Sequence, residues 1–375
     1  MPRRTHRKSR NGCLECKRRH VKCDEKQPIC SNCTVSERVC DYGTRFITAA
    51  PRAPLVQSAS AAPTSVPRAS PDSSPAAFAD QPVNMLHVEL FHNLYTQTHA
   101  TFRISMSMPW IAQIITHSIT TPYLVNEMLA FSALHLSTTR PPQREFYRYH
   151  AAQLQTQALA IFKDSNPTVT QETCIPLFLF SSLLGIHMLC DTLIYRENDF
   201  VQFLDRFVHY LRLHHGVRTI LGQAWPMLRG SLLQPAFEIG MALYKLDGPL
   251  GPECENLLNR VVAAKLTKDL TDTYRRAIEA LQSCLNVAEK ADEQHASINA
   301  VVAWPVLISL DFSDLLEQRR PEALVILAHY AVLLHRFRDS WVLGGSGRFV
   351  IEEVTRYLGE EWDGWLRWPG EELHC

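Results

Sequence analysis

Six cysteines in the first 40 residues have types and spacing that suit metal binding. They follow the pattern C-x2-C-x6-C-x6-C-x2-C-x6-C, and they are Cys13, Cys16, Cys23, Cys30, Cys33 and Cys40. The pattern is an internal repeat, because adding 17 to each of the first three positions gives the last three. Cysteine thiolates are common ligands of structural zinc, and a reducing cell interior favours metal binding over disulfides.

Each repeat has one ligand too few to hold a zinc ion of its own. A structural Zn²⁺ takes four ligands in a tetrahedron, so three cysteines per repeat suffice only if one cysteine of each repeat bridges both ions. Symmetry requires equivalent bridging positions, and the arithmetic leaves three pairs open: Cys13/Cys30, Cys16/Cys33 and Cys23/Cys40. A closed shell has no place for water or substrate, so the sequence predicts two structural zinc ions whose binding folds the module.

Three other interpretations of the same residues are disfavoured. A disulfide framework or two unrelated zinc sites would not need the repeat, and a basic N-terminus with no apolar stretch behind it predicts no secretory signal. The chain is therefore expected inside the cell. A role for His20 as a ligand is also disfavoured, because six cysteines already complete both shells.

A run of basic residues, Lys17-Arg-Arg-His-Val-Lys22, lies between the second and third cysteines. Residues 1–45 hold 12 Lys/Arg against 5 Asp/Glu, a formal +7, whereas residues 84–375 hold 24 against 31, a formal −7. We expect the run on a two-turn helix that fits a DNA major groove, with Val21 turned inward. A merely solvated basic face is the alternative. The candidate DNA-binding residues are Lys17, Arg18, Arg19, His20, Lys22 and, from the N-terminal arm, Arg10.

Composition divides the chain into three parts. Residues 1–45 form the cysteine-rich module with its basic arm. Residues 46–83 are a linker in which 23 of 38 residues are Pro, Ala or Ser, and we expect it to be disordered. Residues 84–375 form a long body with apolar residues at regular spacing, and no coiled-coil heptads follow the last cysteine.

The body is predicted to be all-helical. Apolar residues in the segment from Phe200 to Leu211 recur at i, i+3, i+4, i+7, i+8 and i+11, which is one face of a helix. Residues 323–334 are apolar all round, as in a central helix covered on every side. Proline and glycine breaks suggest ten to twelve helices. The most apolar stretch, residues 174–190, is too short to span a bilayer and is interpreted as a buried helix.

The cysteine pattern and the basic run resemble the binuclear zinc cluster of the fungal Zn2Cys6 transcription regulators. The resemblance implies that Cys13 and Cys30 bridge the two ions and that each C-x2-C opens a short helix. It also implies that Lys17 and Lys22 contact phosphates of double-stranded DNA, and that Arg19 and His20 lie where the family presents the group that reads a C·G-rich triplet. Such proteins work in the nucleus with transcription coregulators.

One position departs from the family pattern. Members of the family generally carry Lys or Arg where this chain has His20, and a neutral imidazole offers one donor and no full charge. We therefore expect His20→Lys to tighten DNA binding. A short helix inspects only a few base pairs, so useful specificity needs a second half-site, as a homodimer would provide, or further contacts.

Segments of the body resemble the regulatory region of the sterol uptake control type of Zn2Cys6 proteins. They are Met85-Leu-His-Val-Glu-Leu-Phe-His92, Ala303-Trp-Pro305 and Arg320-Pro-Glu-Ala-Leu-Val-Ile-Leu-Ala-His-Tyr-Ala331. The resemblance implies a sterol or other apolar ligand held between helices, with Phe178 and Phe180 in its lining. A fully packed core is the alternative, and the body would then belong to a DNA-tethered repressor or scaffold that binds protein partners.

An enzyme is the competing class of function. The chain contains none of the motifs H-E-x-x-H, G-x-x-x-x-G-K-[ST], G-x-G-x-x-G or G-x-S-x-G. The only patterned ligand set is the closed cysteine shell, which leaves no open metal position. The sequence therefore predicts a DNA-binding regulator and no enzyme.

Overall fold

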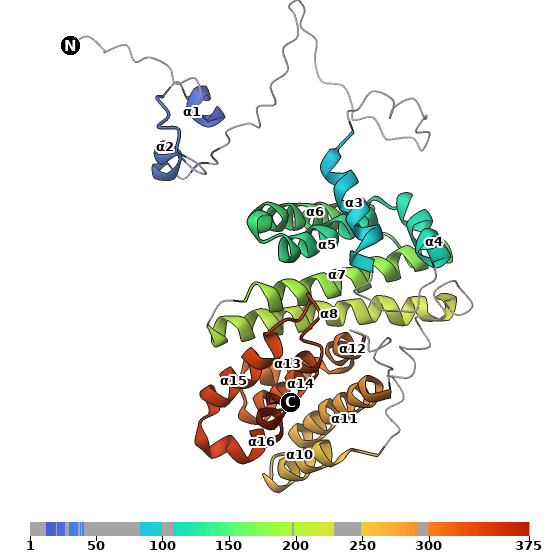
Figure 1. Ribbon diagram of the computed structural model, residues 1–375, viewed down its shortest axis with the longest axis vertical. Coiled ribbons are helices and arrows are strands. Elements are labelled where there is room, and N and C mark those ends of the chain that lie inside the picture. The colour runs from blue at the N-terminus through green and yellow to red at the C-terminus, as the bar shows by residue number, and fades with distance from the viewer. Residues whose placement is uncertain are drawn as a thin grey trace, which may run out of the picture. The chain divides into compact units, whose positions relative to one another are not determined.

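The chain forms two compact units, Met1–Asp80 and Gln81–Cys375, and each is described by itself. The computed structural model describes residues 13–19, 21–26, 30–36, 38, 40, 83–99, 108–196, 199–228, 249–290 and 299–374. Within these ranges the regular elements are all helices and no strand occurs (Figure 1). This confirms the predicted class, a cysteine module followed by an all-helical body. The linker predicted at 46–83 lies outside the described residues as far as residue 82.

The first unit has two short helices, α1 (Leu14–Arg18) and α2 (Ser31–Val35). Helices of five residues are unstable in isolation, because nucleation costs more than one turn of hydrogen bonds returns. Among the described residues of this unit, the buried cluster between the two helices consists of cysteines. Apolar burial therefore cannot fold this unit, and the free energy must come from what the cysteines bind.

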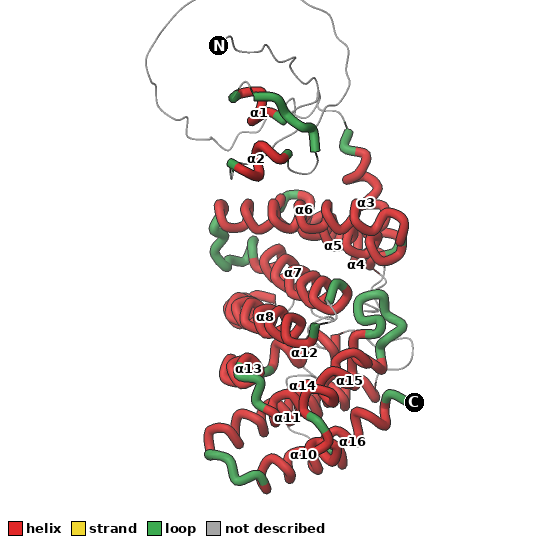
Figure 2. The backbone as a smooth tube through the Cα atoms, turned by 90° about the vertical axis from the view of Figure 1, so that its left-hand side faces the viewer, coloured by secondary structure: helices red, strands yellow, loops and turns green. Residues whose placement is uncertain are grey.

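The second unit is a stack of helices. Its α-helices are α3 (Met85–Thr96), α4 (Met108–Ile119), α5 (Pro122–Thr139), α6 (Arg144–Ser165), α7 (Cys174–Ile194), α8 (Phe200–Leu228), α10 (Pro252–Ala263), α11 (Lys268–Lys290), α12 (Asn299–Leu307), α13 (Leu310–Glu317), α14 (Pro321–Arg336), α15 (Ser346–Leu358) and α16 (Asp363–Glu372). Two short 3-10 helices, η3 (Pro141–Gln143) and η4 (Glu360–Trp362), precede α6 and α16. The pair α5 and α6 forms one end, α7 and α8 the middle, and α10 to α16 the other end (Figures 1 and 2).

Helix α14 is the centre of the last group. Every residue from Glu322 to His335 is buried, as the all-round apolar pattern predicted. The helix packs against α15, α16 and α11. Trp304 of α12 stacks on Tyr330 of α14 with ring centroids 4.3 Å apart, and its indole Nε1 donates to the Ala277 carbonyl at 3.0 Å. These aromatic contacts join three helices into one core.

The helix boundaries follow local signals only in part. Proline occupies the first turn of α5, α10 and α14, where its missing N–H costs no hydrogen bond. In contrast, Pro305 and Pro369 lie inside helices. The described part of the body contains thirteen α-helices, more than the ten to twelve expected. One extra boundary falls at Ser309, whose hydroxyl accepts from the Phe312 amide and begins α13 without a proline or glycine.

Helix α7 is longer than the apolar stretch that predicted it. At 21 residues it is the one described helix that is long and apolar enough to cross a bilayer, so the expectation that it is too short was wrong. The helix continues to Ile194, and at its C-terminal end the Tyr195 amide donates to the Asp191 carbonyl at 3.1 Å. The helix packs between α5 and α8, and its buried face makes it part of the core.

Candidate metal centre and nucleic-acid interface

The two C-x2-C segments begin the two short helices. Cys13 is the N-cap of α1, and its Sγ accepts from the Cys16 amide at 3.4 Å. Cys30 holds the equivalent place before α2, and the Cys33 amide donates to the Cys30 carbonyl at 3.0 Å. The repeat in the sequence is therefore a repeat in the structure, and it confirms that each C-x2-C opens a helix.

The six sulfur atoms fall into two groups of four. One group is Cys13, Cys16, Cys23 and Cys30, the other is Cys13, Cys30, Cys33 and Cys40, and within each group the sulfurs lie within 4.8 Å of one another. Two cysteines, Cys13 and Cys30, are common to both groups. This is the arrangement that two four-coordinate ions need when they share two ligands, so the geometry favours one of the three pairs that ligand counting left open.

The sulfur separations fit zinc and exclude a disulfide among these residues. Cys13 Sγ lies 3.7 Å from the sulfurs of Cys30 and Cys33, and Cys16 Sγ lies 3.6 Å from that of Cys30. Sulfurs bound about 2.3 Å from a tetrahedral zinc lie about 3.8 Å apart, whereas a disulfide requires about 2.05 Å. None of the six cysteines forms a disulfide.

The close packing of the six thiols also indicates that cations are needed to stabilise their ionised forms. Burial raises the pKa of Cys33, and hydrogen bonds to neighbouring cysteines raise it further, to about 12. Burial alone would raise the pKa of Cys30 too, but hydrogen bonds from the Cys33 amide and nearby thiols outweigh it and bring the value to about 6. Six thiolates cannot all ionise in this space unaided, and two Zn²⁺ ions supply the compensating charge.

The basic run is less helical than predicted. Helix α1 ends at Arg18, and Arg19 is its C-cap. Val21 and Lys22 follow in non-helical backbone, and Val21 is 41% exposed, so the prediction that it turns inward on a two-turn helix was wrong. The Val21 amide donates to the Cys16 carbonyl at 3.1 Å, a wide turn that ends the helix. The helix must end early because Cys23 has to return to the metal centre.

The described cations of the run are exposed but differ in their contacts. Lys17 and Lys22 project to solvent. Arg18 pairs with Glu15 at 2.9 Å. Arg19 Nη1 donates to the Ser36 hydroxyl at 2.9 Å, which ties α1 to α2. The other two candidate DNA-binding residues, Arg10 and His20, lie outside the described residues.

Residues that tie the two repeats together were missed by the sequence analysis. Asp24 accepts from the Ser31 hydroxyl at 2.6 Å and from the Ser31 amide at 3.1 Å, at the start of α2. Asn32 Nδ2 donates to the Lys22 carbonyl at 2.6 Å. A signal was available, because an aspartate follows the third cysteine of each repeat, as Asp24 and Asp41.

The helical body does not gather a second cysteine or histidine cluster in its described residues. Phe180, named as a lining residue for an apolar ligand, is 2% exposed. Its ring centroid lies 5.0 Å from that of Tyr123 and 4.8 Å from that of Phe162. These side chains fill the space between α5, α6 and α7.

Comparison with known proteins agrees with the geometry of the first unit. Residues 11–47 match the family model of the fungal Zn(2)-Cys(6) binuclear cluster domain. A Zn(2)-C6 fungal-type transcription factor of Gibberella zeae is 26% identical over 98% of this chain and 86% of its own length. The transcription factor afumD of Aspergillus fumigatus is 26% identical over 88% of this chain and 86% of its own length.

The likeness to sterol uptake control proteins is high but short. Sterol uptake control protein 2 of Candida albicans is 58% identical over 40 residues, which are 11% of this chain and 6% of that protein.

The cysteine geometry and the comparisons together define the class of protein. The chain carries the fungal Zn(2)-Cys(6) binuclear cluster domain and is similar along most of its length to fungal transcription factors of this type, and its six gathered cysteines fit two structural zinc ions. The two relatives that match most of the chain are named as transcription factors, which agrees with the prediction that the chain is a regulator and no enzyme.

Proposed function

We propose that the chain recognises short C·G-containing half-sites in double-stranded DNA through its first 45 residues. In this proposal all six cysteines hold the zinc pair, and Cys13 and Cys30 bridge the ions. Their membership of both four-sulfur groups is the observation that carries the proposal. A rigid cluster of this kind fixes the direction of α1 and presents its cations to one groove.

The DNA contacts divide into two kinds. Lys17 and Lys22, which are exposed and on either side of the run, contact phosphates and set the register on the duplex. Arg19 and His20 face the bases, where Arg19 is held in place by its bond to Ser36. Arg18 and Arg10 add backbone contacts of the kind that make affinity salt-dependent.

The arrangement of parts follows from this role. Residues 1–45 bind DNA, residues 46–83 tether this module to the body, and residues 84–375 regulate transcription. The protein acts in the nucleus, with transcription coregulators as partners. A homodimer would place two readers on two half-sites and so supply the specificity that one short reader lacks. Binding-site selection from random DNA with the zinc-loaded protein tests the recognition. A selected set without a shared C·G-containing triplet would refute it.

For the body we favour partner binding over a sterol ligand. An apolar ligand between α5, α6 and α7 would have to displace Phe180, which stacks on Phe162 and meets the edge of Tyr123. Lipid extraction and mass spectrometry of the purified chain decide between these alternatives, because a bound sterol would be recovered in stoichiometric amount. A reporter driven by the body on an unrelated DNA-binding domain then separates activation from repression.

A further inference from the structure

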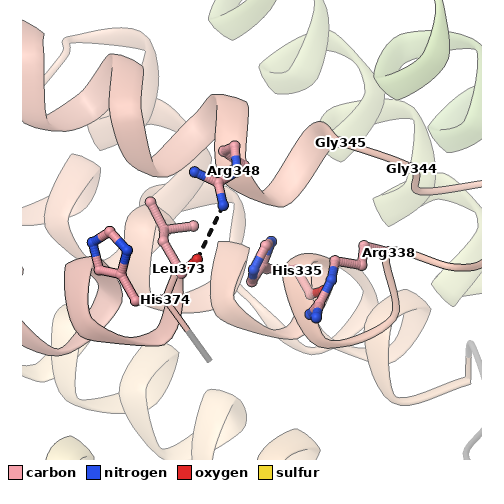
Figure 3. A pocket seen from close by; sticks show the side chains of 7 residues that line it. All are labelled: His335, Arg338, Gly344, Gly345, Arg348, Leu373 and His374. Carbon is pink, nitrogen blue, oxygen red and sulfur yellow. Dashed lines mark hydrogen bonds between the residues drawn. The ribbon is translucent and has the colours of Figure 1, made fainter.

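A pocket of about 460 Å³ lies where the end of α14, the start of α15 and the end of α16 meet (Figure 3). Four of its seven lining residues carry basic side chains and none is acidic. The lining residues are His335, Arg338, Gly344, Gly345, Arg348, Leu373 and His374. The volume falls within the range of small-molecule sites.

A buried histidine side chain in the lining lacks a partner. His335, in the last turn of α14, is 5% exposed, and its Nδ1 is buried without a hydrogen bond among the described residues. Its ring lies between the side chains of Arg348 and Arg338 in Figure 3. A buried polar atom without a partner is unfavourable, and such an atom in a pocket indicates that something else is bound there.

The two arginines keep donors for a ligand. Arg338 Nη1 donates to the His335 carbonyl at 3.2 Å. Arg348 donates to the Leu373 carbonyl at 3.0 Å and to Glu352 at 3.3 Å. A guanidinium has five N–H donors in a fixed fork, so these contacts leave part of each fork free.

Glu352 pairs with Arg348, and a second carboxylate whose charge acts on His335 is already engaged. Glu372 accepts from Arg336 Nη2 at 2.7 Å and from the Trp368 indole at 3.0 Å. It therefore does not neutralise the pocket arginines. Burial, together with the charges of Arg338 and Arg348, lowers the pKa of His335, which keeps the imidazole neutral at pH 7.

Two glycines leave room for a ligand beside the start of α15. Gly345 is the N-cap of this 13-residue helix and has no side-chain cap, and an added Cβ on Gly344 would meet nothing within 4 Å. A ligand can therefore reach the backbone before the helix, where the dipole favours negative charge.

We propose that this pocket binds a small organic anion that carries a carboxylate or phosphate group. The guanidinium groups of Arg338 and Arg348 match the oxygens of such a group, and the neutral His335 Nδ1 completes the set of contacts. The ligand would join α14, the central helix, to α15 and α16. Its use as a signal that changes transcription rests on the proposed function, whereas the binding itself does not.

Calorimetric titration of the zinc-loaded full chain with sodium phosphate and with sodium citrate tests the site, at ionic strength held constant with sodium chloride. We expect saturable binding of at least one anion, and an affinity at least about tenfold weaker in Arg338→Gln and Arg348→Gln. The matched control is Arg356→Gln, because Arg356 lies on α15 like Arg348 but pairs with Glu353 outside the pocket. It should bind like the wild type.

The outcomes separate cleanly. Binding of both anions supports a general oxyanion site, and binding of citrate alone identifies a carboxylate site. Absence of binding to both anions, or equal affinity in Arg338→Gln and Arg356→Gln, overturns the proposal. Arg338→Gln removes one exposed side chain, and the far-ultraviolet circular dichroism of each variant checks that it is folded. Calorimetry needs no DNA, so a failure of the proposed DNA recognition leaves this result intact.

Discussion

The two units of this chain are held together by different forces. Among the described residues of the first unit, the buried cluster consists of five cysteines, and the half-buried Cys40 packs against it. In the second unit the core is a continuous set of Leu, Val, Ile and aromatic side chains centred on α14. The first unit therefore takes its folding free energy from metal coordination, and the second takes it from apolar burial.

The chain carries a convenient reporter for this difference. All seven tryptophans lie in the second unit, beginning with Trp110. Tryptophan fluorescence therefore follows the body alone, while zinc content and DNA binding follow the first unit. Each prediction below uses this separation.

Removal of zinc should produce the largest effect. Structural zinc in small domains is worth about 10–16 kcal/mol, more than the unit can recover from its two short helices. A chelator should abolish DNA binding in a gel-shift titration and leave tryptophan fluorescence unchanged. A loss of both signals together would show that the two units fold as one.

Substitution of a shared sulfur should have the same result. Cys13→Ser removes a ligand from both four-sulfur groups, so native mass spectrometry should find neither zinc bound. The matched control is Cys375→Ser, because Cys375 lies outside the cysteine repeat. It should retain two zinc ions per chain.

Truncation of the central tryptophan should damage the body only. Trp304 is fully buried, stacks on Tyr330 and donates a hydrogen bond to the Ala277 carbonyl, and its truncation removes both contacts. Trp304→Ala should lower the free energy of unfolding by about 3–5 kcal/mol. Urea denaturation followed by the remaining tryptophans measures this, and the half-buried Trp362 supplies a milder comparison as Trp362→Ala. Zinc content should stay at two in both.

Acid should weaken the body through a buried histidine. His329 is 3% exposed, and burial lowers its pKa to about 4, with the nearby charge of Arg260 adding to the effect. In the unfolded chain the His329 imidazole is protonated near pH 6.5, whereas in the folded body it is protonated only near pH 4. His329 therefore leaves stability unchanged above pH 6.5 and lowers it by about 1.4 kcal/mol per pH unit between pH 6.5 and about pH 4.

The measurement is urea denaturation at several pH values, followed by tryptophan fluorescence. His329→Gln should reduce the slope between pH 6.5 and 4, whereas His374→Gln should keep it, because His374 is exposed. Equal slopes in the two variants would show that His329 does not carry this dependence.

A smaller effect is expected where α14 and α15 meet most closely. A Cβ added to Gly347 would lie 2.3 Å from the His335 backbone nitrogen, so Gly347→Ala should force the helices apart and cost about 1–3 kcal/mol. Gly370, inside α16, has nothing within 4 Å of an added Cβ. Gly370→Ala should therefore stabilise the body by about 0.5–1 kcal/mol. Urea denaturation that gave both variants the same sign would contradict the predicted crowding.

Sequence reasoning succeeded where one local pattern determines the structure. The cysteine repeat predicts the metal centre because zinc fixes the number of ligands, and the apolar run at residues 323–334 predicts a buried helix because every face is apolar. Ligand counting alone could not choose the shared pair, since that depends on which sulfurs the backbone brings to the centre. The structure supplied Cys13 and Cys30.

The remaining features depend on contacts between distant segments. Helix α1 ends early because Cys23 returns to the metal centre, and the helix propensities of the residues do not predict this. The close approach at Gly347 depends on the backbone of His335 in another helix. The basic pocket combines Arg338, Arg348 and His374 from two helix ends and a turn, and no spacing in the sequence relates them.

The smallest expected effect concerns one phosphate contact. Lys17 is exposed on α1, and in the proposed complex it neutralises one DNA phosphate. Lys17→Ala should reduce the slope of log affinity against log salt by about 0.9 and weaken binding equally for preferred and random sequences. Gel-shift titrations at several salt concentrations measure both quantities. Lys163→Ala is the control, because Lys163 is an exposed lysine of the body. If Lys163→Ala changed the slope as much, the body would also contact DNA, and the division of labour between the two units would fail.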